Sequence, residues 1–236
     1  MRKLVIAVVL LAAMGLAAPV AQAGPVLSWV ELGFKSSANG LVYDNPYDPD
    51  SNGWPPAGAV FSPGFLATGL GTVTFTFSGA GSHFVAGFFD YQIVDPANNN
   101  GLDDEYGVLH GGPGLGQSWE IDDSFLGSLF PHFYAFDGAT PLLNSNGLPS
   151  TNPGDVAVGL GYAFTLAAGD PAKSVIFTVS RNAPSGYYLE QNDPLSGEAV
   201  YFSQTVGGGP VIPEPGTLTL VGLGLAAAAR RLRRRA

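Results

Sequence analysis

The chain has 236 residues, no cysteine, and 10 basic against 19 acidic side chains. The absence of cysteine excludes disulfides, catalytic thiols and thiolate metal sites. The acidic surplus excludes charge-driven binding to nucleic acid or to anionic lipid surfaces, so we expect neither as a partner.

The N-terminus has the pattern of a secretory signal peptide over residues 1–23. Two basic residues precede an apolar run over residues 4–18, and Ala21 and Ala23 then form an A-x-A site. This order of a basic region, an apolar region and a small-residue site is typical of a signal peptide that is cleaved after its last alanine. We therefore expect export by the Sec translocon and cleavage by signal peptidase.

The body between the two ends is strongly acidic. Residues 24–212 contain only Lys35, Lys173 and Arg181 as basic residues and hold eighteen of the acidic ones, a net charge of −15. Such a body repels its own copies, stays soluble and offers carboxylates to divalent cations. Its length is sufficient for one domain with a hydrophobic core.

The composition of the body predicts many short strands, because turn formers alternate with Thr, Val, Phe and Tyr. In Thr72–Phe77 the apolar Val73, Phe75 and Phe77 alternate with threonines, which predicts a strand with one buried face. Residues 173–181 repeat this pattern.

The segment Val156–Leu166 alternates in side-chain size rather than in polarity. The even-numbered positions from 158 carry large apolar residues, whereas positions 157, 159, 161 and 163 carry only Ala and Gly. We expect the large face to pack into the core and the small face to lie closely beneath a second strand or loop.

The remaining elements are weaker. A single helical turn is expected at 124–129, with Asp122 or Asp123 as its N-cap. About eight to eleven antiparallel strands in residues 24–206 favour an all-β body, a single jelly-roll-like β-sandwich, with a small barrel as the alternative. Residues 207–212 then form a linker. Further strands are predicted at 26–34, 84–94, 105–110, 118–121, 132–136, 186–191 and 198–205.

Residues 213–236 combine three ordered signals. Pro213, Glu214 and Pro215 precede an uncharged apolar segment, and Arg230, Arg231, Arg233, Arg234 and Arg235 follow it. As a helix, residues 216–229 would span about 21 Å, against a hydrocarbon core of about 30 Å. We expect a short transmembrane helix that keeps its arginines cytoplasmic and the body periplasmic.

This order resembles the PEP-CTERM sorting tail of exported proteins in Gram-negative bacteria. The resemblance implies cleavage near Glu214 by an exosortase, a membrane cysteine protease, and a place in exopolysaccharide or biofilm systems. An ordinary short C-terminal anchor is the alternative. The blocks 116–122, 163–169 and 185–191 are also similar to bodies of other PEP-CTERM proteins, which implies a shared domain without an assigned activity.

One loop has the beginning of a calcium-binding pattern. Asp48, Asp50 and Asn52 occupy positions 1, 3 and 5 of an EF-hand-like loop, and Gly53 occupies position 6. Position 12 is Ala59, so the bidentate glutamate is missing. A calcium site and a plain Asx-turn cluster therefore both remain open.

Other metal sites are less well supported. The acidic stretch 95–105 fits a solvated hairpin loop, although its last three acids could join a composite site. His83, His110 and His132 stand alone in their segments, so zinc binding would require all three to meet in space.

Catalytic signatures are absent, since no G-x-S-x-G or H-E-x-x-H motif occurs. We expect no enzyme and no required cofactor, and interpret the body as a non-catalytic structural or interaction protein of the cell surface or biofilm matrix. A calcium-assisted polysaccharide-binding module is the alternative, and a glycosidase with two carboxylates is third. Aromatic side chains that could stack on sugar rings are Trp29, Trp54, Trp119, Tyr187 and Tyr188.

Overall fold

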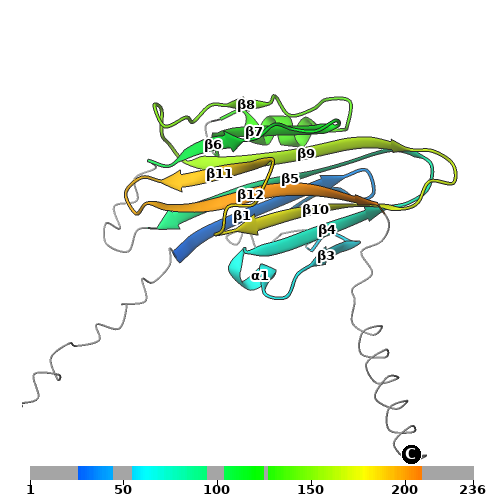
Figure 1. The fold of residues 1–236 in the computed structure, drawn as a ribbon, viewed down its shortest axis with the longest axis horizontal. Helices are drawn as coiled ribbons and strands as arrows, with labels where there is room; N and C mark the ends of the chain where they lie inside the picture. Colours follow the sequence, from blue (N-terminus) through cyan, green and yellow to red (C-terminus); the bar gives the residue numbers. More distant parts are fainter. Residues whose placement is uncertain (1–25, 45–54, 95–103, 125–126, 209–236) are drawn as a thin grey trace, which may run out of the picture.

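The computed structural model describes residues 26–44, 55–94, 104–124 and 127–208. Two six-stranded sheets account for most of this region (Figure 1). The prediction of an all-β body is thereby confirmed. The described residues form twelve strands, slightly more than expected, because the short β2, β3 and β8 carry no clear alternation in the sequence. These three are Gly40–Asp44, Ala59–Phe61 and Ser145–Asn146.

Sheet A has the order β2-β1-β5-β9-β7-β8. Its neighbours are antiparallel except for β7 and β8, which are parallel and depart from the antiparallel expectation. The long β5 pairs with β1 on one side and with β9 on the other over most of its length. The bounds of its other strands are β1 Val26–Ser36, β5 Gly81–Val94, β9 Val156–Leu166 and β7 Gln117–Asp123.

Sheet B has the order β3-β4-β10-β12-β11-β6, and all its neighbours are antiparallel. Its clearest strand is β4, where Val73, Phe75 and Phe77 are buried as their alternation predicted. The strands that complete the sheet are β4 Gly71–Phe77, β10 Lys173–Ser180, β12 Glu198–Gly208, β11 Tyr188–Asp193 and β6 Tyr106–His110.

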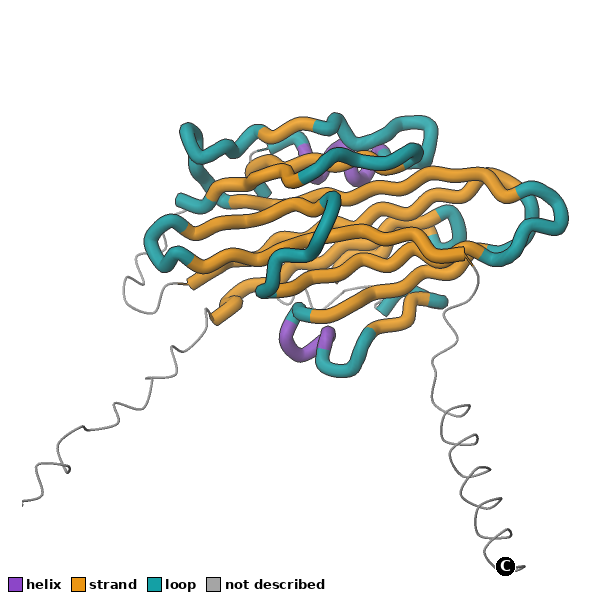
Figure 2. Tube along the Cα trace, viewed as in Figure 1, coloured by secondary structure: helices purple, strands orange, loops and turns teal. Residues whose placement is uncertain are grey.

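Two short helices, α1 Phe65–Thr68 and α2 Leu129–Ala135, interrupt the strands (Figure 2). The strand predicted at 132–136 is therefore wrong, and the helical segment lies after the turn predicted at 124–129. Buried Leu129 and Phe133 are four residues apart, the spacing of one helical face. Pro131 is tolerated because it lies in the first turn, where its missing N–H costs no hydrogen bond.

The two sheets meet in one aromatic core. Phe34 of β1 lies 5.3 Å from Phe75 of β4, and Phe89 of β5 lies 5.9 Å from Phe177 of β10, measured between ring centroids. Tilted and edge-on contacts of this kind are the favoured geometries of aromatic pairs. The inward faces of both sheets are thus buried against each other.

A second, smaller core covers the opposite face of sheet A. Phe88 of β5 packs there against Leu129 and Phe133 of α2. A Cβ built on Gly159 would lie 2.6 Å from Leu129 Cδ1, and one on Gly161 would lie 2.7 Å from Phe136 Cε2. The small face predicted for β9 is confirmed, because only glycine lets the α2 segment approach so closely.

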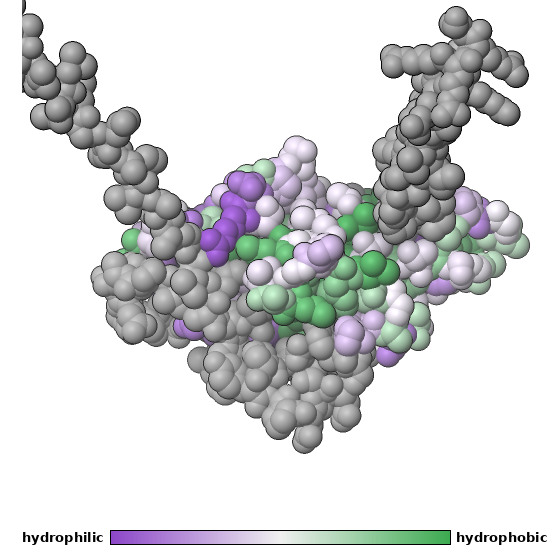
Figure 3. Space-filling view, turned by 90° about the horizontal axis from the view of Figure 1, so that it is seen from below, coloured by the Kyte–Doolittle hydropathy of each residue, from purple (hydrophilic) through white to green (hydrophobic). Residues whose placement is uncertain are grey.

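The end of the body differs from its predicted bounds. Gly207 and Gly208 pair with Ser174 and Lys173 of β10, so β12 continues two residues into the range predicted as linker. β12 is also an interior strand, between β10 and β11. At the lower edge of Figure 1, α1 and β3 expose Leu66 and Val60, and the view from below shows apolar side chains on this side (Figure 3).

Candidate functional site

Most residues predicted to carry a function lie outside the described residues. These are the cleavage-site Ala21 and Ala23, the calcium candidates Asp48, Asp50 and Asn52, and the tail residues Pro213, Glu214, Pro215, Arg230, Arg231, Arg233, Arg234 and Arg235. The structure does place position 12 of the calcium pattern. Ala59 is the first residue of β3 and pairs with Phe75, so this position is part of sheet B and supplies no side-chain ligand.

The calcium hypothesis remains a prediction with a direct test. A folded-state calcium site would raise the melting temperature of the protein by several degrees at millimolar calcium, and EDTA would reverse the shift. The same shift should vanish in an Asp48→Asn/Asp50→Asn variant. Identical melting curves with calcium and with EDTA would show that the loop is a plain Asx-turn cluster that binds no calcium.

The acidic stretch 95–105 ends in a side chain that is not available to a solvent cation. Glu105 is buried, and its Oε1 accepts a 2.8 Å hydrogen bond from the Ile93 N–H. Its Oε2 accepts from Gln191 Nε2, which also donates to the Tyr91 carbonyl. Burial raises the pKa of Glu105 to about 8, against these hydrogen bonds, and the charges of Asp155 and Asp193 add to the rise. Glu105 thus links β5, β11 and its own segment by hydrogen bonds inside the body.

A second buried carboxyl lies on β5. Asp90 is opposite Glu31 of β1 in the sheet and shares a side-chain hydrogen bond with Ser124. Burial raises its pKa to about 8, and the negative charges of Asp155 and Glu31 push it in the same direction. Ser124 Oγ donates its one hydrogen to Asp155, so the Ser124 hydroxyl lies between two carboxyls at this end of sheet A. A carboxyl that holds its proton at neutral pH is a poor cation ligand.

The three histidines do not share a site. His83 stacks on Phe164, and its ring centroid lies 5.4 Å from that of Phe164. His110 stacks on Tyr188, and His132 contacts Glu120. Within the described part of the chain, no three His, Cys, Asp or Glu side chains are arranged to hold a metal ion.

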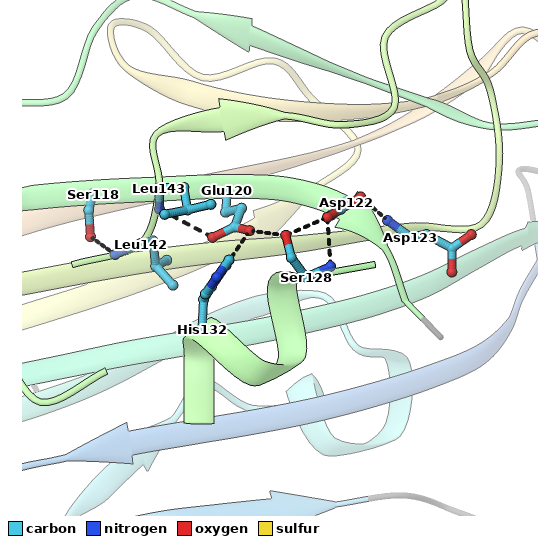
Figure 4. A network of polar contacts seen from close by, with 8 residues as sticks. All are labelled: Ser118, Glu120, Asp122, Asp123, Ser128, His132, Leu142 and Leu143. Carbon is cyan, nitrogen blue, oxygen red and sulfur yellow. Dashed lines mark hydrogen bonds and ion pairs between the residues drawn. The ribbon is translucent and has the colours of Figure 1, made fainter. Parts of the chain in front are cut away.

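A network of polar contacts joins α2 to β7 (Figure 4). Glu120 of β7 is fully buried beneath α2, next to Gly159 of β9. Its Oε1 accepts a 2.9 Å hydrogen bond from Ser128 Oγ and lies 2.8 Å from His132 Nδ1. Its Oε2 accepts a 3.2 Å bond from the Leu143 N–H. Both side-chain oxygens of Glu120 therefore have hydrogen-bond partners inside the protein, as buried polar groups require.

Asp122 completes this network at the start of α2. Its Oδ2 accepts from both the N–H and the hydroxyl of Ser128, each at 2.7 Å, and its Oδ1 accepts from the Asp123 N–H at 2.9 Å. Burial alone would raise the pKa of Asp122, but these hydrogen bonds to the charged form outweigh it and hold the pKa below its usual value. The prediction that Asp122 or Asp123 is the N-cap is wrong, because the N-cap of α2 is Ser128, and Asp122 instead bonds the N–H and the hydroxyl of Ser128.

Ser128, His132 and the two carboxylates include the residue types of a nucleophilic serine site, but not its geometry. The one hydrogen of the Ser128 hydroxyl is shared between Glu120 and Asp122, whereas a nucleophilic serine donates to the imidazole that takes its proton. His132 Nδ1 is already engaged with Glu120. The network fastens α2 to sheet A.

Residues 211–235 match the model of the PEP-CTERM protein-sorting motif. The chain carries a PEP-CTERM sorting motif. This confirms the resemblance stated for Pro213, Glu214, Pro215 and the arginine cluster. The PEP-CTERM motif implies an exported protein with a C-terminal membrane-anchoring signal that an exosortase processes. No curated protein and no solved structure matches the chain.

The PEP-CTERM match covers only the tail and gives no information about the body. Among the residues that the structure describes, no helix is long and apolar enough to cross a membrane. The sequence analysis did not predict the Glu120 network. The one signal for it in the sequence is an acidic residue, Glu120, between the apolar Trp119 and Ile121 of a predicted strand.

Of the five aromatic residues proposed for sugar stacking, the three whose side chains are described do not share one surface. Trp119 is buried in the main core, and Tyr187 packs against that core. The side chains of Trp29 and Trp54 lie outside what the structure describes. Tyr188 differs from these, because it lies half-exposed on the outer face of sheet B.

Proposed function

We propose that this protein is exported, held in the inner membrane by its C-terminal segment, cut there by an exosortase, and delivered as a non-catalytic β-sandwich to the outer surface or biofilm matrix of a Gram-negative bacterium. The match of residues 211–235 to the sorting motif carries the proposal. The signal-peptide pattern of residues 1–23 supports the same route from the other end of the chain.

The buried carboxyls support a non-catalytic body. Glu105 and Glu120 each bond groups of the protein interior. A glycosidase instead needs two carboxyls that face one bound sugar, with the acid and the base or nucleophile both within reach of the scissile bond. The buried acids of this body hold its parts together.

The test replaces Pro213, Glu214 and Pro215 by alanine in a Gram-negative host that contains an exosortase. We expect the variant to accumulate in the inner membrane as a precursor that keeps its arginine cluster. The wild-type protein should leave that membrane without the cluster. Cell fractionation and mass spectrometry of the C-terminal peptide measure both results.

A matched control places the same triple alanine substitution in the exposed loop 149–151 of the body. This variant should be processed like the wild type. The proposal fails if the motif variant is cut and exported normally, or if the mature wild-type protein still ends in its arginine cluster.

A further inference from the structure

Three aromatic rings from three neighbouring strands line up on the outer face of sheet B. They are His110 of β6, Tyr188 of β11 and Tyr201 of β12, and we call them the aromatic row. The ring centroids of His110 and Tyr188 are 4.4 Å apart with an interplanar angle of 12°. Those of Tyr188 and Tyr201 are 5.8 Å apart at 71°. Each ring is therefore held by its neighbour in the row.

Strand alternation explains why these rings point outward. Leu189, Val200 and Phe202 are the sequence neighbours of the two tyrosines, and all three are completely buried in the core. Side chains adjacent in a strand point to opposite faces, so Tyr188 and Tyr201 emerge on the other side of the sheet. Adjacent strands are about 4.8 Å apart, so a row across three strands is about 10 Å long. That length suits a short stretch of sugar units.

Polar groups accompany the row on the same face. Glu190 Oε2 lies 2.5 Å from His110 Nε2, and Asn192 Nδ2 donates to Glu190 Oε1. Burial, followed by the nearby Glu190 carboxylate, raises the pKa of the Tyr201 phenol, so its hydroxyl remains a donor at neutral pH. The row thus combines apolar ring surface with a phenol, an amide and a carboxylate at its side.

This combination matches the chemistry of a sugar chain. Pyranose rings present C–H groups that pack against aromatic carbon, and their hydroxyl groups bond to polar side chains around them. Because His110 and Tyr188 cover one face of each other, the row offers a sugar its ring edges and the ring surface that this stacking leaves open. The carboxylate of the row is paired with an imidazole, and the body carries a net charge of −15. Polymers of uronic or sulfated sugars would be repelled by this charge, whereas an uncharged polymer would not.

We propose that the aromatic row binds an uncharged polysaccharide. The binding site consists of the rings of His110, Tyr188 and Tyr201, with Glu190 and Asn192 as hydrogen-bonding partners for sugar hydroxyls. This role goes beyond sorting and does not depend on it, because it concerns the folded body alone.

The experiment is affinity electrophoresis of the full-length protein in native gels, in a detergent without a sugar headgroup. The gels contain hydroxyethylcellulose, laminarin, galactomannan or alginate. We expect at least one of the three neutral polymers to retard the wild type, and alginate to have no such effect. Tyr188→Ala should weaken the retardation at least tenfold, since it removes the central ring of the row and the surface on which His110 stacks, whereas Tyr188→Phe should keep most of it.

Tyr134→Ala provides the matched control, because Tyr134 is a 60% exposed tyrosine on α2, on the other sheet. It should bind like the wild type. The proposal is overturned if no neutral polymer retards the wild type, if only alginate does, or if Tyr188→Ala and Tyr134→Ala behave alike. Thermal melts check that each variant is folded, and Tyr201→Ala takes the place of Tyr188→Ala if that variant does not fold.

Discussion

Raising the pH from 5 to 8 will lower the free energy of unfolding, and Asp90→Asn will remove a large part of that loss. Asp90 and Glu105 both have their pKa raised to about 8 in the folded protein, mainly by burial. In the unfolded chain they lose their protons near their usual values of about 4. Unfolding therefore releases protons between these two values, so stability is full below about pH 4 and falls until about pH 8.

The size of this effect follows from linkage. Each group can lower the free energy of unfolding by up to about 1.4 kcal/mol per pH unit within the window, and by nothing further above it. An asparagine at position 90 keeps the shape of the protonated acid but does not ionise. We expect Asp90→Asn to resemble the wild type at pH 5 and to be the more stable protein at pH 8, as measured by urea unfolding with tryptophan fluorescence.

Asp137→Asn is the control for this series. Asp137 is an exposed loop residue whose pKa is lowered by hydrogen bonds from the Thr140 and Ala139 N–H groups, so it titrates below the window. Its substitution should leave the pH dependence unchanged. A wild-type stability that is flat from pH 5 to 8, or an Asp90→Asn variant with the wild-type slope, would contradict the assignment.

Gly161→Val will separate α2 from sheet A. A Cβ at this position would already lie 2.7 Å from both Phe136 Cε2 and Ser118 Oγ, and valine adds two methyl groups in the same space. Overpacking of this kind costs about 1 to 3 kcal/mol. For a protein of this size the melting temperature should fall by about 2 to 4 °C per kcal/mol.

Gly207→Val in β12 is the matched control, since a Cβ there would meet nothing within 4 Å. Its effect on stability should stay within about 0.5 kcal/mol, as for other open surface positions. If the two valine variants have the same melting temperature, the α2 segment does not pack against β9 as closely as described. Amide exchange of residues 129–136 would locate the loss in the Gly161→Val variant.

The two clearest predictions from the sequence depended on patterns that are local in the chain. The alternation of large and small residues in Val156–Leu166 fixed both faces of β9, since the period of a strand is two residues. The sorting motif of the tail could also be predicted, because its three signals follow one another directly in the sequence and do not depend on how the chain folds. Its match over residues 211–235 confirms the sorting motif.

The α2 segment and the polar sites could not be predicted in the same way. Residues 132–136 are rich in aromatic residues, which prefer strands. They nevertheless lie in or next to α2, because Gly159 and Gly161 leave space on sheet A that side chains of the α2 segment fill. Glu120 meets His132 only because the chain folds back over β7. The aromatic row needs His110 and Tyr188, far apart in sequence, to be opposite each other in neighbouring strands. Contacts of this kind depend on register, which the sequence alone did not give.

Because β12 lies between β10 and β11, sheet B can be completed only after the residues of β12 have been made. Sheet B consists of two separate halves until residues 198–208 arrive, because β10 and β11 have no contact across the sheet without that strand between them. A body with so distant a pairing partner completes its fold late, after nearly all of the chain has been made. The strand that joins the two halves of sheet B therefore lies at the C-terminal end of the body, shortly before the sorting motif of residues 211–235.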